Sequence, residues 1–240
     1  MLHSLHSTAV FAVLVIGCVA FDCGTTASCT AELDEPQPKP KQQGLKLGGR
    51  VGIVCDHTMV EHANALRATL EAWRLRVDLH RLVQHWQAEQ FFQKHMAEYD
   101  YVIICCHGTD RPKLRIKFEV IVPKKENLEL GEMVDYELTT ENISAKLKGF
   151  RGVLVSMACE SGREPLGKAF LKAGCKAYLG PGDYSDDSSG MMFVMSFFYF
   201  LQYQWRLPDS QVWSIKDAAD AARKLDPRAK YGTKLWQLYE

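Results

Sequence analysis

The stretch Tyr101–Gly108, YVIICCHG, joins a continuous apolar run to a His-Gly pair at its end. An apolar run rich in β-branched residues is typical of a central parallel strand that is covered on both faces. Comparable runs lie at Val51–Cys55, Gly152–Met157 and Cys175–Leu179. We therefore expect a mainly parallel sheet with Tyr101–Cys106 as one of its central strands.

Segments with helical periodicity separate these runs. Between Met59 and Trp73, apolar residues recur every three or four positions, as on one face of a helix. A further strand is expected at Arg76–Leu82, and helices are expected at Trp86–Met96 and Met191–Tyr203. A short helix should be capped by Thr139 or Thr140 and end near Gly149, and another should run from Pro165 to Gly174. The final helix is expected from a cap at Asp209 to Pro227. Strands that alternate with helices predict a three-layer α/β fold.

A charged hairpin is inserted into this alternation. From Lys113 to Val120, charged and apolar residues alternate, which predicts a half-exposed strand. Pro123–Asn127 favours a turn into a partner strand at Leu128–Leu138. Two roles remain open for the hairpin, namely a solvated face and an exosite or gate over a neighbouring cleft.

The composition excludes some classes of partner. Because 29 Lys and Arg balance 29 Asp and Glu, the chain has no global positive field and no nucleic-acid partner is expected. A chain with 47% hydrophobic and 24% charged residues is typical of a globular protein. The 8 cysteines show no metal-ligand spacing, so no metal site is expected. The Cys/His catalysis considered below requires no cofactor, and none is expected.

Residues 1–48 differ from the rest of the chain. Ala9–Phe21 is apolar but shorter than the roughly 20 residues that span a bilayer, which favours a signal segment. Val15–Cys18 also resembles a lipoprotein box, and a lipid anchor there is the only membrane attachment expected. No basic residue precedes Lys39, so a misassigned start codon and a cytoplasmic protein remain open. A Pro-rich linker at 32–48 would then lead to a single domain at 49–240.

The strand ends carry the residues suited to catalysis. His107-Gly108 follows one expected central strand and Cys159 follows another, so both reach the same edge of a parallel sheet. A thiol beside an imidazole is the pairing needed for nucleophilic catalysis, and a nearby helix N-terminus would lower the thiol pKa. Each dipeptide alone is more often a turn or a buried residue, but the pair favours catalysis.

The blocks around these residues resemble a known family. A hydrophobic block before His-Gly and a second before Ala-Cys are similar to the caspase-like (clan CD) cysteine peptidases, and LTTENISAKLKGFRGVLVSMACESG, Leu138–Gly162, resembles the CHAT domain peptidases. The likeness continues through Leu166–Gln202 and KDAADAARK. It implies a caspase-like fold and cysteine endopeptidase activity on polypeptides, with His107 and Cys159 catalytic and the N–H groups of Gly108 and Cys159 in the oxyanion site.

The resemblance also has departures and open points. Met157 stands where the family often has a small serine, and Gly182 replaces a tryptophan, which puts the pocket shape in doubt. The family's helical repeats are absent, so activation would need the N-terminal segment or a separate activator protein. The alternative is an inactive caspase-like binding module or pseudoenzyme.

The loop Gly180–Ser189 is the source of a predicted specificity. Three carboxylates without a basic residue, those of Asp183, Asp186 and Asp187, form a candidate cation receptor. In the resembled family an acid of this loop lines the pocket for a basic residue, which implies cleavage after Arg with Asp183 as first choice and Asp186 as second. The open alternative is that Asp186 or Asp187 only caps the following helix.

Overall fold

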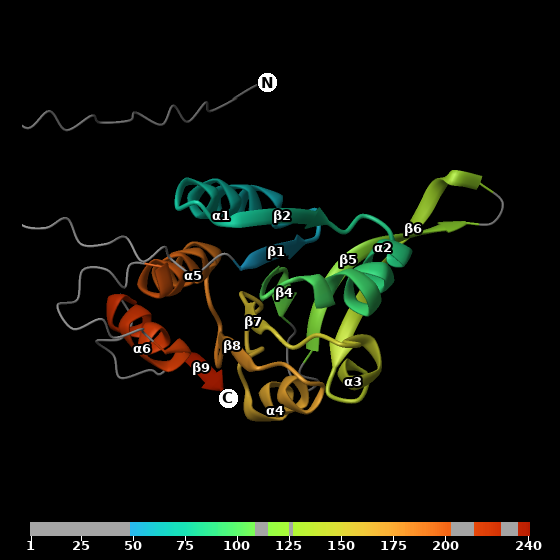
Figure 1. Ribbon diagram of the computed structural model, residues 1–240. Coiled ribbons are helices and arrows are strands. Elements are labelled where there is room, and N and C mark those ends of the chain that lie inside the picture. The colour runs from blue at the N-terminus through green and yellow to red at the C-terminus, as the bar shows by residue number, and fades with distance from the viewer. Residues whose placement is uncertain (1–48, 109–114, 125–126, 203–213, 227–234) are drawn as a thin grey trace, which may run out of the picture. The chain divides into compact units, whose positions relative to one another are not determined.

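The centre of the protein is a six-stranded sheet, seen in Figure 1, with the strand order β2-β1-β3-β7-β8-β9. The strands are β1 (Arg50–Cys55), β2 (Arg76–Arg81), β3 (Tyr101–Cys105), β7 (Val153–Ser156), β8 (Ala177–Pro181) and β9 (Trp236–Tyr239). All neighbours pair in parallel except β8 and β9, which are antiparallel. The predicted three-layer, mainly parallel α/β fold is confirmed, with β3 as a central strand.

Helices cover one face of this sheet with apolar side chains. These are α1 (Val60–Ala72), α5 (Asp187–Gln202) and α6 (Ile215–Leu225). The almost wholly apolar segment predicted near Met191 is buried in this layer, where Phe193, Phe197 and Leu201 of α5 contact the sheet's core cluster. Each of these helices therefore packs its apolar face on the sheet, because burial of apolar side chains is the main favourable contribution to folding.

The opposite face is covered by α2 (His85–Gln90) with its π and 3₁₀ extensions η1 (Phe91–His95) and η2 (Met96–Glu98), by α3 (Ile143–Lys146) and by α4 (Glu164–Lys172). Alternate residues of the buried strands supply both faces. In β3, for example, Ile103 belongs to the first layer and Ile104 to the second. This two-sided burial accounts for the continuous apolar runs in the sequence.

The inserted hairpin forms a separate sheet. β5 (Arg115–Lys124) pairs antiparallel with β6 (Asn127–Thr139), and β4 (His107–Gly108) pairs with β5, which gives the order β4-β5-β6. Ile116, Phe118 and Val120 are buried, whereas the charged residues between them are half-buried, as the alternation predicts. The hairpin thus connects directly to the end of the central strand β3.

Several predicted boundaries were wrong. The short helix α3 begins after Asn142, not after Thr139 or Thr140, and the Asn142 side chain bonds the preceding main chain of Thr139 and Glu137 but no N–H group of the helix. The final helix α6 has its cap at Ser214, whose side chain accepts a bond from the Asp217 N–H. The fifth strand was predicted to start at Cys175, but β8 starts at Ala177 because the Cys175 N–H still bonds Phe170 at the end of α4.

The structure, a computed structural model, describes residues 49–108, 115–124, 127–202, 214–226 and 235–240. The signal, lipoprotein and linker predictions for 1–48 lie outside these residues, as does the cap predicted at Asp209. Within the described ranges, no helix has the length and apolar character needed to cross a membrane.

Candidate active site

The His107-Gly108 pair and Cys159 meet at the carboxyl edge of the central sheet. β3 leads into β4 through Cys106, and β7 leads through Met157 and Ala158 to Cys159. Gly108 packs directly on the main chain of Cys159, because a Cβ atom built on Gly108 would lie 1.9 Å from the carbonyl oxygen of Cys159 and 2.6 Å from its nitrogen. The two segments that the sequence analysis paired are therefore in contact.

The second sheet holds His107 in place. His107 is exposed and pairs with Lys117 of β5, while Gly108 pairs with Ile116. Lys117 in turn forms ion pairs with Asp135, at 3.1 Å, and with Glu119, at 3.8 Å. The charged face beside His107 is thus an ion-paired network of side chains from both hairpin strands. The exosite role of the hairpin stays a prediction.

The loop that carries Cys159 is held by hydrogen bonds on both sides of it. The Ser156 Oγ accepts bonds from the Ala158 N–H, at 3.2 Å, and from the Ser161 Oγ, at 3.0 Å. Beyond Cys159, the Gly162 N–H donates to the Pro181 carbonyl, at 2.7 Å, and its carbonyl accepts a bond from Tyr239. These bonds fix the loop against β8 and β9, as preorganisation of a nucleophile requires.

Glu160 shows that the loop is strained next to Cys159. Its φ of 56° lies in the left-handed region, which is uncommon for a residue other than glycine. The side chain is buried and forms an ion pair with Arg163, and the Glu160 N–H donates to the Asp183 carbonyl at 3.2 Å. Arg163 also donates to the Gly182 carbonyl. The backbone turn at the candidate nucleophile is therefore imposed by buried contacts to the 182–183 loop.

The Cys159 thiol is half-buried and lies against Ser185. The Sγ donates to the Ser185 carbonyl, at 3.3 Å, and accepts a bond from the Ser185 N–H, at 3.4 Å. Burial raises the pKa of the thiol above its ordinary value of 9.0; the Ser185 N–H lowers this pKa, and the charge of Asp187 raises it. The expected lowering of the thiol pKa by a helix N-terminus is wrong for this state, because the loss of hydration outweighs the N–H contact.

This raised pKa predicts how Cys159 reacts with iodoacetamide. The thiolate is the reactive form, so alkylation of the protein without substrate should keep accelerating above pH 9, since a raised pKa leaves the thiol protonated at neutral pH. Rates would be followed by mass spectrometry of the Cys159 peptide, with Cys159→Ala as background. A rate that levels off below pH 8 would contradict the prediction and indicate a thiolate–imidazolium pair at rest.

The two candidate specificity residues differ in their surroundings. Asp183 is exposed, and its Oδ1 accepts a bond from the Tyr184 N–H at 2.9 Å. Asp186 precedes α5 and accepts two bonds from Ser189, from the N–H at 2.8 Å and from the Oγ at 2.6 Å. Asp186 therefore caps α5, as the alternative interpretation of this loop predicted, whereas Asp183 bonds the N–H of the next residue. Both aspartates are exposed.

The capping contacts give a second prediction. Replacing Asp186 by Ala should lower the free energy of unfolding by about 1 kcal/mol, because the orphan N–H of Ser189 loses its acceptor. Asp186→Asn should retain most of this stability, and Asp183→Ala should change it by less than about 0.5 kcal/mol. Urea unfolding measures all three. An Asp186→Ala protein as stable as the parent would show that the cap contributes nothing.

Ser185 and Tyr184 are site residues that the sequence analysis missed as individuals. Both lie in the acidic loop that was singled out, but only the fold shows that Ser185 contacts the thiol and that Tyr184, the preceding residue, is 59% exposed. No sequence signal could have identified the main-chain N–H and carbonyl of Ser185 as the partners of the Cys159 thiol. Among the described residues, no group of three or more His, Cys, Asp or Glu side chains is arranged to hold a metal ion.

Comparisons with known proteins show the fold. No family model and no curated protein matches the sequence. Solved structures with a similar fold include the Arg-specific cysteine proteinase gingipain R, with a TM-score of 0.53 and 11% identity over 80% of this chain and 46% of that one. The complex of the pro- and mature domains of RgpB from Porphyromonas gingivalis gives a TM-score of 0.52 and 10% identity, over 80% of this chain and 47% of that one.

A third similar structure is the separase–securin complex of Saccharomyces cerevisiae. It has a TM-score of 0.50 and 11% identity over 80% of this chain and 12% of that one. This chain therefore spans less than half the length of the gingipain chains it matches. Gingipain R and separase are clan CD cysteine peptidases, so the chain has the α/β architecture of the caspase-like fold.

Proposed function

We propose that this protein is a caspase-like cysteine endopeptidase that cleaves polypeptides with Cys159 as nucleophile and His107 as general base and acid. The observation that carries the proposal is the packing of Gly108 on the Cys159 main chain, which brings His107-Gly108 to the only half-buried cysteine of the five described. The other four described cysteines are buried. The finer assignment to the CHAT domain peptidases rests on the sequence blocks around these residues.

The proposed reaction begins with a proton transfer. Because the raised pKa keeps the resting thiol protonated, His107 takes the Cys159 proton as the sulphur attacks the scissile carbonyl carbon. The C–S bond forms while the carbonyl π electrons move to oxygen, and the N–H groups of Gly108 and Cys159 stabilise that oxyanion. The close approach of Gly108 to the Cys159 main chain supports this assignment.

Breakdown of the intermediate completes the cycle. The C–N bond breaks as His107 gives its proton to the leaving amine, and a thioester on Cys159 remains. His107 then removes a proton from water as the water oxygen attacks the thioester carbonyl carbon. The C–S bond breaks, which releases the new carboxyl terminus and leaves Cys159 as a thiolate. The proton returns to the Cys159 sulphur, so the enzyme is regenerated without a cofactor.

A binding module without activity is the alternative, and one observation favours it. The Cys159 thiol is engaged by both main-chain groups of Ser185, and no hydrogen bond joins it to the described His107 side chain. Incubating the protein with a diverse peptide library and sequencing the products distinguishes the peptidase from the binding module. New termini that are lost in Cys159→Ala support the peptidase, whereas intact peptides that remain bound support the module.

The proposed specificity is cleavage after Arg. Asp183 has an exposed carboxylate, and its carbonyl bonds the N–H of Glu160, the residue next to Cys159. Gingipain R, a structure of similar fold, is Arg-specific by name. A guanidinium can pair with a carboxylate through two bonds, which Lys cannot do. We assign Asp183 as the first candidate for this contact and Asp186, which already caps α5, as the second.

A set of otherwise identical peptides with Arg, Lys, Leu or Asp at the cleaved position tests this specificity. We expect Arg to be preferred, and Asp183→Ala to lower kcat/KM for the Arg peptide by about 10- to 100-fold through the loss of a charged hydrogen bond. The rate for the Leu peptide should change little. Preference for Leu or Asp, or an Arg preference that survives both Asp183→Ala and Asp186→Ala, would overturn the assignment.

A further inference from the structure

The outer edge of β2 carries main-chain groups that no described residue pairs with. β2 is the end strand of the six-stranded sheet, and among the described residues only β1 pairs with it. The Leu82 N–H donates to the Cys55 carbonyl of β1 at 2.7 Å. Because the N–H and C=O groups of successive residues in a strand point to opposite sides, the main chains of Val77, Leu79 and Arg81 face outward. They form an open template for another strand.

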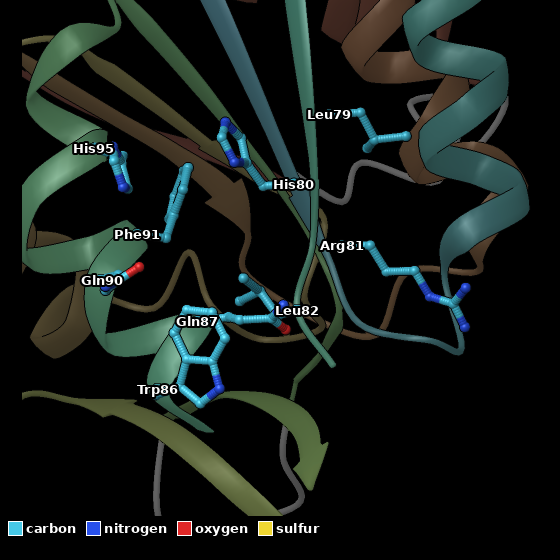
Figure 2. Close-up of a pocket in the computed structure, with 9 residues that line it drawn as sticks. All are labelled: Leu79, His80, Arg81, Leu82, Trp86, Gln87, Gln90, Phe91 and His95. Carbon is cyan, nitrogen blue, oxygen red and sulfur yellow. The ribbon is translucent and has the colours of Figure 1, made fainter. Parts of the chain in front are cut away.

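A groove of about 360 Å³ runs beside this edge, between β2 and the helical segment α2–η1. Figure 2 shows that the side chains of Leu79 and Arg81 leave β2 on the side away from Phe91 and His95. Both residues nevertheless line the groove, so they contribute main-chain atoms to it. The groove therefore presents the hydrogen-bonding edge of β2 itself.

The wall of the groove opposite β2 includes Phe91 and Trp86, and the His80 side chain of β2 packs against this wall. The His80 ring packs on Phe91 with centroids 4.8 Å apart, and its Nε2 bonds the Tyr99 hydroxyl at 2.6 Å. Trp86 of α2 also lines the groove and is 51% exposed, although it is a large hydrophobic residue. An extended peptide on β2 would direct alternate side chains toward this wall, where Trp86 offers an apolar contact.

Charge identifies the kind of peptide. Arg74, Arg76 and Arg81 are exposed at or next to β2, and within the described part of the chain none of them forms an ion pair. The nearby acids Asp78 and Glu98 are both bound by Arg50, at 2.8 Å and 3.2 Å. Among the residues that the structure describes, the positive charge of this edge is therefore not compensated. A second copy of the chain paired through β2 would bring these arginines together, so like-charge repulsion disfavours it.

We propose that the outer edge of β2 binds an extended, acidic segment of a partner polypeptide, which adds to the sheet as a further strand with apolar side chains against Trp86. Main-chain bonds to Val77, Leu79 and Arg81 supply the attachment, and the three arginines select acidic sequences. This binding site is separate from Cys159 and does not require peptidase activity.

The test uses full-length Cys159→Ala protein, so that the probe is not cut. A fluorescein-labelled peptide of alternating Glu and Val is titrated by fluorescence anisotropy, with a Lys and Val peptide of equal length as control. We expect the Glu peptide to bind at least about tenfold more tightly, with affinity falling as salt rises. Hydrogen exchange at Val77, Leu79 and Arg81 should slow on binding. Equal binding of the two peptides, or no binding of either, overturns the proposal.

Two variants of Arg81 separate the main-chain and charge contributions. Arg81→Pro removes one outward N–H, and an edge strand tolerates proline when that N–H faces solvent. Arg81→Gln keeps the N–H and loses only the charge. We expect Arg81→Pro to weaken binding of the Glu peptide by about tenfold more than Arg81→Gln, with unfolding temperatures showing that both variants fold. Identical affinities would exclude strand addition, and a dimer in sedimentation that Arg81→Pro abolishes would make a second copy the occupant.

Discussion

Cys159→Ala should abolish cleavage of any peptide that the parent protein cuts, because no other described cysteine reaches the surface at this edge of the sheet. His107→Ala should lower kcat by about 10²- to 10⁴-fold, the usual contribution of general acid–base catalysis. Both rates would be measured on one fluorogenic peptide chosen from the library products. We expect the cleavage rate of Cys159→Ala to be lower than that of His107→Ala, because the first variant loses the nucleophile and the second loses only its general base.

Cys175→Ala is the matched control for this pair. Cys175 is also a free thiol, but it is buried where α4 leads into β8, away from the Cys159 loop. Its replacement should keep kcat while lowering stability modestly. Cleavage that persists in Cys159→Ala, or that is lost equally in Cys175→Ala, would remove Cys159 from the catalytic role. Thermal unfolding of each variant shows whether a lost rate reflects a lost fold.

Gly108→Ala should have the second largest effect on activity. A Cβ there would lie 1.9 Å from the carbonyl oxygen of Cys159, so the two main chains must separate. Displacement of a catalytic group by about 1 Å can cost roughly 10²-fold in rate, and we expect a fall of that order in kcat/KM. Overpacking should also lower the free energy of unfolding by about 1–3 kcal/mol.

Gly190→Ala provides the comparison for this steric effect. Gly190 lies in α5, where a new Cβ would be no closer than 3.4 Å, to the Cε of the flexible Met157 side chain. The free energy of unfolding of Gly190→Ala should stay within about 0.5 kcal/mol of the parent value or rise by up to about 1 kcal/mol, because alanine is more favourable than glycine within a helix. Full activity in Gly108→Ala would show that the contact with Cys159 does not position the site.

The sequence predicts the central layers well because burial leaves a simple pattern. The strands β1, β3 and β7 are buried on both faces, so each appears as an unbroken apolar run. β9 (Trp236–Tyr239) was missed, because only its pairing with distant β8 makes this short segment a strand. The start of α3 was also misjudged, because Thr139, Thr140 and Asn142 are all residue types that can precede a helix.

For the candidate site, the sequence indicates which residues meet but not their environment. The rule that parallel strands end at one edge is enough to bring His107 and Cys159 together. It could not show that His107-Gly108 is itself a strand of a second sheet, nor that Ser185 covers the thiol. Burial of a side chain depends on loops that are distant in sequence. For this reason the direction of the Cys159 pKa shift was predicted wrongly.

Covalent trapping of the nucleophile tests the central proposal most directly. A peptide ending in Arg and carrying a thiol-reactive acyloxymethyl ketone would be added to the parent protein and to His107→Ala, and the modified residue identified by tandem mass spectrometry. We expect one adduct on Cys159, formed much more slowly in His107→Ala. Labelling spread over several cysteines, or labelling of Cys159 at the same rate without His107, would contradict it.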